Sequence, residues 1–307
     1  MFNEETKRRF IAERNDEVIL PVNYLIREFN EVAAIEEKLQ KDLCDFTLYE
    51  IKEYYKMLNT SSVNRLQVLT SQFSTYTQWC LQQNLVKDNQ NHFLELKGGY
   101  NDCINVALLN EKIVSRETVL KWANECINAK DAFILLALFE GICGKEFCEI
   151  VNLRPEDVNG NIATLCDGRS IEISKELISL IDKCVEEDTY YGKEDDNRVQ
   201  KVYKLIDNGY VVKDFPNIKL SVDEFYRGRR VYYSIKRSMK DQGKENIIRS
   251  SNIVESGKID MIKKRSLELG MSAVDYIYSK NITEVEKKYG CRIYPSSYII
   301  KYRNYLE

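Results

Sequence analysis

The chain of 307 residues is long enough to bury a large core, and its length predicts two domains. Charged residues make up 30% and the formal net charge is −3, which neither requires nor excludes a nucleic-acid partner, because a DNA-binding face is a local property. No apolar run is long enough to cross a membrane and the start MFNEETKRRF lacks a secretory signal, so we expect a cytoplasmic protein with no membrane partner.

The nine cysteines are scattered along the chain, and none forms a CxxC pair. His92 is the one histidine in the sequence, so a zinc site is not expected. Reduced, mostly buried thiols are typical of a cytoplasmic protein. The sequence therefore predicts neither a bound metal nor a cofactor.

Residues 1–96 are predicted to form a helical domain. Thr47-Leu48-Tyr49-Glu50 is a capping box that begins a helix ending at Leu58. Ser62 caps the next helix, predicted over 62–83. Its apolar stripe recurs every three or four residues, at Leu66, Leu69, Phe73, Tyr76 and Cys80.

The opposite face of helix 62–83 carries amides and hydroxyls with a single charge. It consists of Asn64, Arg65, Gln67, Thr70, Ser71, Gln72, Ser74, Thr75 and Gln78. Such groups suit a surface that meets phosphates and base edges, which makes Asn64, Arg65 and Gln67 candidate DNA contacts. The alternative is an ordinary polar face made of weak helix formers, and the residues alone favour neither interpretation.

A linker is predicted over 97–110 and a second domain over 111–307, with its first helices near 116–127, 131–140 and 145–152. Asp167-Gly168 predicts a hairpin between strands 162–165 and 170–173. Asn208-Gly209 predicts a second hairpin, between 202–206 and 210–212. The acidic loop before it is most simply a solvated excursion, made of Glu186, Glu187, Asp188, Glu194, Asp195 and Asp196.

A basic helix is predicted from the capping box Ser221-Val222-Asp223-Glu224 to about Met239. Its buried stripe is expected to be Phe225, Tyr232, Ile235 and Met239. The segment from Phe225 to Lys240 contains no acid and six basic residues, namely Arg227, Arg229, Arg230, Lys236, Arg237 and Lys240. Arg227, Arg230 and Arg237 share one side at helical spacing, which favours contact with DNA phosphates over pairing with the acidic loop.

A family resemblance connects these elements. Residues 131–173 read DAFILLALFEGICGKEFCEIVNLRPEDVNGNIATLCDGRSIEI, with GI-x-x-x-E at a turn and N-L-x-x-x-D-V after it. This succession of helix, turn, helix and hairpin resembles the catalytic domain of tyrosine recombinases, the phage integrase family. The first domain resembles their SAM-like core-binding domain. The resemblance implies a mainly α fold with small β-hairpins (α+β), arranged as a two-domain clamp.

The catalytic groups of that family are largely replaced in this chain. The arginine that grips the scissile phosphate corresponds to Cys143, and the hairpin lysine corresponds to Arg169, which holds phosphate but does not release a proton. The His-x-x-Arg-His box aligns with 246–250, where Arg249 remains and both histidines are gone. The resemblance also makes Lys145 a candidate DNA contact beside Arg169, Lys236 and Arg249.

Two registers place the nucleophile. In one, Leu269-Gly270-Met271-Ser272 matches the family's Leu-Gly-His-Ser, with Tyr276 or Tyr278 slightly too early after it. In the other register, Tyr289-Gly290-Cys291 matches that motif, with Cys291 in place of the histidine, and Ile300 takes the position of the tyrosine. The second histidine is absent from both registers.

Because catalytic groups that act as a unit lose most of their rate enhancement when one is removed, the resemblance implies a DNA-binding protein that does not cleave. Within the family it is similar to repressors that maintain lysogeny of SPβ-type Bacillus prophages. The partners implied are double-stranded DNA with repeated operator elements, further copies of the chain on DNA, and a phage-encoded antagonist, with the protein on the host nucleoid when bound. An atypical active recombinase using Tyr278 or Tyr302, and a regulator that binds only protein, remain as alternatives.

Overall fold

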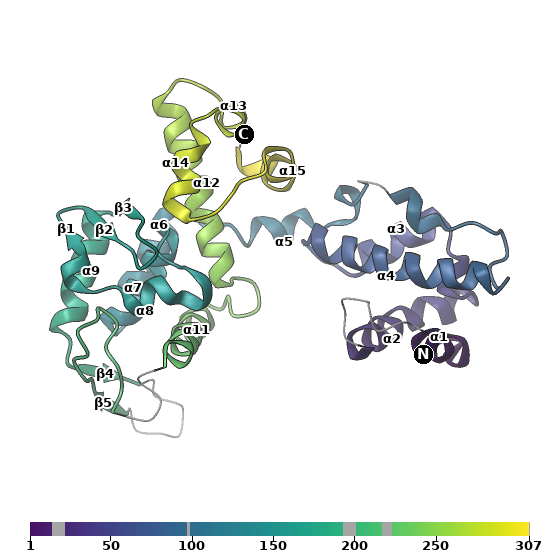
Figure 1. Cartoon of the computed structure of the whole chain (residues 1–307), viewed down its shortest axis with the longest axis horizontal. Coiled ribbons are helices and arrows are strands. Elements are labelled where there is room, and N and C mark those ends of the chain that lie inside the picture. Colours follow the sequence, from purple (N-terminus) through teal and green to yellow (C-terminus); the bar gives the residue numbers. More distant parts are fainter. Residues whose placement is uncertain (14–21, 97–98, 193–200, 217–222, 307) are drawn as a thin grey trace. The chain divides into compact units, whose positions relative to one another are not determined.

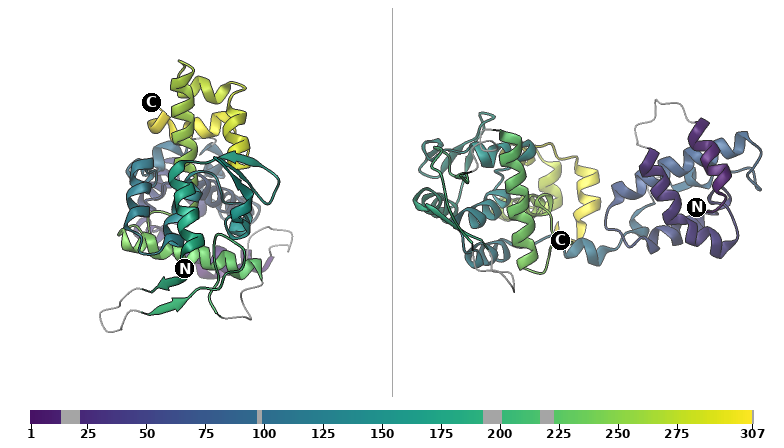
Figure 2. Two further views of the ribbon diagram at one scale, coloured as in Figure 1. Left: turned by 90° about the vertical axis from the view of Figure 1, so that its left-hand side faces the viewer. Right: turned by 90° about the horizontal axis from the view of Figure 1, so that it is seen from below.

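The structure is a computed structural model that describes residues 1–13, 22–96, 99–192, 201–216 and 223–306. It divides into two compact units, Met1–Asn110 and Glu111–Glu307, each with its own hydrophobic core (Figures 1 and 2). Residues 99–110, the described part of the expected linker 97–110, cluster with the first unit. Among the described residues, no helix is long and apolar enough to cross a membrane, and no group of three or more His, Cys, Asp or Glu side chains is arranged to hold a metal ion.

The first unit is helical, as the sequence predicts. Its elements are α1 (Glu4–Glu13), α2 (Val22–Leu39), η1 (Leu43–Asp45), α3 (Leu48–Met57), α4 (Val63–Gln82), η2 (His92–Leu96), η3 (Asn101–Cys103) and α5 (Val106–Asn110). The capping box before α3 is present, since Thr47 and Glu50 each bind the other's backbone N–H. Ser62 caps α4. The predicted stripe of α4 is the centre of the core, with all five side chains fully buried.

The second unit is built around one apolar helix. Its helices are α6 (Arg116–Glu125), α7 (Ala129–Phe139), α8 (Cys148–Asn152), α9 (Lys175–Glu186), α11 (Glu224–Asp241), α12 (Ser250–Glu268), α13 (Ala273–Tyr278), α14 (Ile282–Tyr289) and α15 (Pro295–Leu306), with single turns η4 (Lys145–Phe147) and η5 (Pro155–Asp157). Helices α6, α9, α11 and α12 all pack against α7. Since every side chain from Phe133 to Phe139 is buried, α7 forms the centre of this core.

Two small antiparallel sheets complete the described part of the second unit. β1 (Val158–Asn159), β2 (Ile162–Thr164) and β3 (Ser170–Glu172) form one sheet, and the predicted Asp167-Gly168 turn joins β2 to β3. β4 (Thr189–Tyr191) pairs with β5 (Val202–Lys204) in the other. Part of the acidic loop, 194–196, lies outside the described residues.

The second predicted hairpin is wrong. Residues 210–212 do not pair with β5, because Val211 and Val212 are buried in the core and the Val211 N–H donates to the Leu153 carbonyl at 2.9 Å. The chain still turns at Asn208-Gly209, where Gly209 has a φ of 75°. The one bridge across this turn joins Ile206 to Asp214. Core burial of the two valines therefore outweighs the pairing that the turn residues favour.

Helix α11 buries a different face from the one expected. Phe225 is 49% exposed and Tyr232 is 53% exposed, whereas Ile235 and Met239 are buried as predicted. Small residues share the buried stripe, which consists of Arg227, Gly228, Val231, Ser234, Ile235, Ser238 and Met239. A Cβ at Gly228 would overlap the Glu146 carbonyl oxygen, so the glycine allows α11 to approach η4 closely. The N-cap is Asp223; Ser221 and Val222 lie outside the described residues.

Candidate nucleic-acid interface

Cys143 stands at the turn after α7, where the family resemblance expects an arginine. Gly141 makes this turn with a φ of 97°, a conformation that glycine adopts without strain. The Cys143 N–H donates to Glu149 Oε2 at 2.8 Å. Burial, followed by the Glu149 charge, raises the pKa of the Cys143 thiol to about 11. The group at this position is therefore a neutral thiol, which offers no charge to a phosphate.

Arg169 at the hairpin points into the unit. Its guanidinium binds Glu149, Asp167 at 2.5 Å, and the carbonyl oxygens of Lys288 at 2.7 Å and Lys287 at 3.1 Å. The two carbonyls belong to the C-terminal end of α14, where few backbone N–H groups remain to bind them, and the Lys287 carbonyl also accepts the Gly290 N–H at 3.4 Å. An arginine is long enough to satisfy them. Phosphate binding by Arg169 does not agree with this geometry, because four internal partners already occupy the side chain.

The segment around Tyr289 supports one nucleophile register. The Tyr289 hydroxyl donates to the Phe139 carbonyl at 2.7 Å, and a Cβ at Gly290 would meet the Arg169 guanidinium. Residues 289–291 thus pack beside the Cys143 turn and the hairpin, whereas Gly270 follows α12. In this register the position of the tyrosine belongs to Ile300, which is 56% exposed.

The two tyrosines of the alternative mechanism lie in different surroundings. Tyr278 ends α13 and is 63% exposed. Tyr302 is buried on α15, and burial together with the nearby Glu255 raises the pKa of its hydroxyl. A raised pKa makes Tyr302 a poorer nucleophile, since less of it is phenolate.

Arg249 is exposed at the start of α12 and lies in a cationic neighbourhood. Burial lowers the pKa of Lys112, and the charges of Arg249 and Lys301 lower it further. Burial also lowers the pKa of Lys301, on α15. These cations come from three separate segments of the second unit. A bound anion would relieve the repulsion between these cations, so the neighbourhood is suited to contact with a phosphate.

The inner arginines of α11 are held by the second unit itself. Arg227 is 6% exposed and binds the Val151 carbonyl and Asp214. Arg230 binds Asp214 at 3.0 Å, and Arg237 binds Asp131 at 3.4 Å. The three arginines do share one side, as their spacing predicts. Arg227 is buried, Arg230 is half-buried and the Arg237 side chain is 38% exposed, and each already has an acidic partner within the unit. These internal pairs make the three arginines poorer candidates for DNA contact, and their acidic partners are not the predicted loop.

The exposed side of α11, called here the outer face, combines cations with aromatic rings. It consists of Phe225, Tyr226, Arg229, Tyr232, Tyr233, Lys236 and Lys240. Lys236 pairs with Glu245 at 3.4 Å, and the Arg229 guanidinium lies 5.9 Å from the Phe225 ring centroid. Arg229, Lys240 and the aromatic residues were not among the predicted contacts. The sequence signal that could have identified the buried face of α11 is the spacing of three small residues suited to close packing, Gly228, Ser234 and Ser238.

Lys145 is exposed on η4, which packs against α11. It makes no hydrogen bond or ion pair with another described residue. η4 is a separate turn rather than part of α8, because Glu146 and Phe147 have positive φ values of 54° and 66°. Lys145 therefore adds a cation beside α11.

In the first unit, the uncharged face of α4 is only partly accessible. Asn64 and Gln67 are exposed, together with Ser71, Thr75 and Gln78. Thr70 and Gln72 are buried, and the Thr70 hydroxyl binds the Leu66 carbonyl and Tyr55. Arg65 is half-buried, and its guanidinium pairs with Glu31 at 2.9 Å. The exposed amides and hydroxyls form one stripe along the helix.

Comparison with known proteins matches both units. A family model described as the MrpR C-terminal catalytic domain matches residues 113–306, and one described as the MrpR N-terminal core-binding domain matches residues 1–82. A curated relative, the SPbeta prophage-derived uncharacterized protein YopR of Bacillus subtilis (strain 168), is 24% identical over 224 residues, which cover 69% of this chain and 67% of the relative. The predicted resemblance to recombinase-type prophage proteins is confirmed, as is the two-domain recombinase-type fold.

Solved structures of recombinases are also similar. A XerA recombinase is 14% identical, with 97% of this chain and 92% of that chain covered and a TM-score of 0.40. A lambda integrase dimer bound to a COC′ core site is 13% identical, with 98% and 93% covered and a TM-score of 0.41. At these TM-scores the fold rests on the two family models.

Proposed function

The chain belongs to the MrpR family, and from this membership we propose that it is a sequence-specific double-stranded DNA-binding repressor of a prophage that does not recombine DNA. The observation that carries the proposal is the contrast between two parts of the second unit. The catalytic positions are neutral or internally bonded, at Cys143 and Arg169, while cations and aromatic rings stand exposed on the outer face of α11.

Strand cleavage needs cations on the scissile phosphate, a proton donor for the leaving oxygen and a nucleophile. Cys143 supplies no charge, and the guanidinium of Arg169 is occupied and keeps its proton near neutral pH. Ile300 has no nucleophilic atom. Because these catalytic groups are all absent, we expect the chain to bind DNA without cleaving it.

Duplex recognition fits the exposed groups. Helix α11 has 18 residues, so it is about 27 Å long, and an α-helix fits the major groove of DNA. Arg229, Lys236 and Lys240 supply phosphate contacts, and the hydroxyls of Tyr232 and Tyr233 donate to or accept from base edges. Lys145 and Arg249 add cations from η4 and α12. In the first unit, Asn64 and Gln67 contribute amides that read base edges.

The proposal includes repeated operator elements, self-association on DNA and a phage-encoded antagonist that relieves binding. All three follow from similarity to prophage repressors rather than from particular contacts. Genome-wide capture of fragments bound by the purified protein tests specificity and operator repeats together. We expect a small set of fragments that share a repeated sequence. Random recovery of fragments would contradict sequence-specific binding.

A suicide substrate, in which a nicked strand traps any covalent intermediate, tests the alternative of an active recombinase. We expect no DNA–protein adduct. An adduct that disappears in Tyr278→Phe or Tyr302→Phe would establish cleavage and overturn the proposal.

A further inference from the structure

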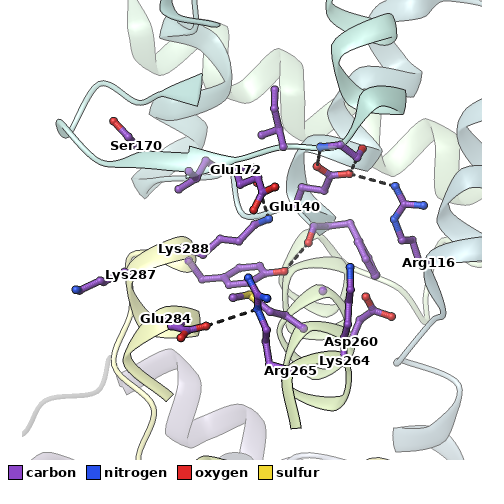
Figure 3. A pocket seen from close by; sticks show the side chains of 17 residues that line it. Arg116, Glu140, Ser170, Glu172, Asp260, Lys264, Arg265, Glu284, Lys287 and Lys288 are labelled. Atoms are coloured by element: carbon purple, nitrogen blue, oxygen red, sulfur yellow. Dashed lines mark hydrogen bonds and ion pairs between the residues drawn. The ribbon is translucent and has the colours of Figure 1, made fainter. Parts of the chain in front are cut away.

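The second unit contains a cavity of about 690 Å³ between α12, α14, β3 and the C-terminal end of α7 (Figure 3). Its size is within the range of ligand-binding clefts. Part of the lining is apolar, from Phe139, Ile171, Ile173, Met261 and Tyr289. None of the residues proposed above to contact DNA lines it. The cavity is therefore a separate feature of the unit.

Most acidic side chains of the cavity already have partners. Glu140 pairs with Arg116 at 3.6 Å and accepts the Ser174 N–H at 2.8 Å. Glu284 pairs with Arg265 at 3.5 Å. These contacts join neighbouring elements that line the cavity, so the carboxylates of Glu140 and Glu284 have a structural role.

Three lysines of the cavity form no ion pair with another described residue. Lys264 and Lys287 are exposed and form no side-chain hydrogen bond or ion pair with another described residue. The Lys288 ammonium donates to the Glu172 carbonyl at 2.7 Å, and burial lowers its pKa. Figure 3 shows Lys264 and Lys288 extending into the space between α12 and β3, whereas the Lys287 side chain lies on the outer side and points away from it. A partner that brings a carboxylate would complete these contacts.

Asp260 lies among these groups on α12. It is half-buried and has no hydrogen bond or ion pair with another described residue, and burial raises the pKa of its carboxyl, followed by the charge of Glu117. A backbone N–H of a bound segment would satisfy this oxygen.

The net charge of the lining decides which anion fits. The residues that line the cavity include five cationic and four acidic ones, which leaves a single positive charge. A polyphosphate would meet repulsion from the four carboxylates, whereas a segment with one carboxylate matches the surplus. We propose that the cavity docks a segment of a partner protein in which a large apolar side chain stands next to a carboxylate.

The test uses a displayed library of random 12-residue peptides, selected on the full chain without DNA. We expect enrichment of peptides that pair one acidic residue with a large apolar one. The selected peptide, labelled with fluorescein, should bind at least tenfold more weakly to the double variant Lys264→Glu/Lys287→Glu in an anisotropy titration. Lys280→Glu changes an exposed lysine of the same unit that does not line the cavity, so it is the matched control and should leave the affinity unchanged.

Hydrogen exchange locates the bound peptide. Slower exchange at the end of α14 and along α12 is expected when the peptide is present. Selection of no peptide, or of peptides that bind the charge-reversed variant equally well, would overturn the proposal. Because DNA is absent throughout, these results are independent of the proposed DNA binding.

Discussion

Glu149 holds the guanidinium of Arg169 while its other oxygen accepts the backbone N–H of Cys143. This buried carboxylate joins the turn after α7 to the β2–β3 hairpin, two places where the recombinase family presents cations to DNA. Because Arg169 pairs with Glu149, a position that is catalytic in the recombinase family has a structural role in this chain. It also connects the hairpin to α14, through the two carbonyls that the same guanidinium binds.

Replacement of this carboxylate is expected to destabilise the second unit. Glu149→Gln removes the buried counter-charge of the mostly buried Arg169 and leaves only the exposed Asp167, which costs about 3 kcal/mol by analogy with other buried pairs. Urea unfolding of the full chain measures the change. Asp167→Asn removes the more exposed partner of the same arginine and should cost less than about 1 kcal/mol. Equal losses in the two variants would show that Glu149 is not the anchor.

The two sides of α11 are expected to separate binding from stability. The triple variant Arg229→Ala/Lys236→Ala/Lys240→Ala should keep the fold and bind DNA more weakly. If each cation contacts one phosphate, the slope of log affinity against log salt becomes shallower by about 2.7. Gel-shift titration at several salt concentrations measures this slope.

The inner arginines supply the matched comparison, with the same number of cations removed from the same helix. Arg227→Ala/Arg230→Ala/Arg237→Ala should lower the unfolding free energy, because the buried carboxylates of Asp214 and Asp131 lose the arginines that pair with them. Its salt slope, measured under conditions where it stays folded, should equal that of the wild type. A shallower slope for the inner variant alone would reverse the assignment of the two faces.

A close contact between α7 and α12 in the second unit depends on a glycine. A Cβ at Gly257 would overlap the Phe139 carbonyl oxygen, so Gly257→Ala forces α12 away from α7. We expect a loss of about 1–3 kcal/mol, the usual cost of overpacking, measured by thermal unfolding. Gly99→Ala is the control, since its added Cβ would meet only ordinary van der Waals contact at 3.7 Å. No difference between the two variants would contradict this packing.

His92 is expected to give the first unit a measurable pH dependence. Its ring binds Asp88 at 2.7 Å and Glu95 at 2.6 Å, and the hydrogen bond to Asp88 is the main cause that raises its pKa above 6.5. A raised folded pKa means that this stabilisation is full below the unfolded value near 6.5 and is lost as pH rises through the folded value. The one imidazole of the chain allows direct NMR titration. Asp88→Asn should lower the measured pKa, and an unchanged value would remove Asp88 as the cause.

Local patterns were sufficient for most of the framework. The capping box at Thr47, the stripe of α4 and the Asp167-Gly168 turn depend on neighbours a few residues apart, and each forms as predicted. The family resemblance of residues 131–173 is likewise a property of adjacent elements. Such features can be predicted from the sequence because their interactions lie within one helix or one hairpin.

Contacts distant in the sequence settled the rest. Asp214 and Asp131 draw three arginines inward and so rotate α11, and the carbonyls of α14 capture Arg169 from more than a hundred residues away. Val211 and Val212 are buried in the core instead of forming the hairpin that Asn208-Gly209 favours. In each case the free energy comes from a buried partner on another element, and no periodicity within the segment records which partner that is.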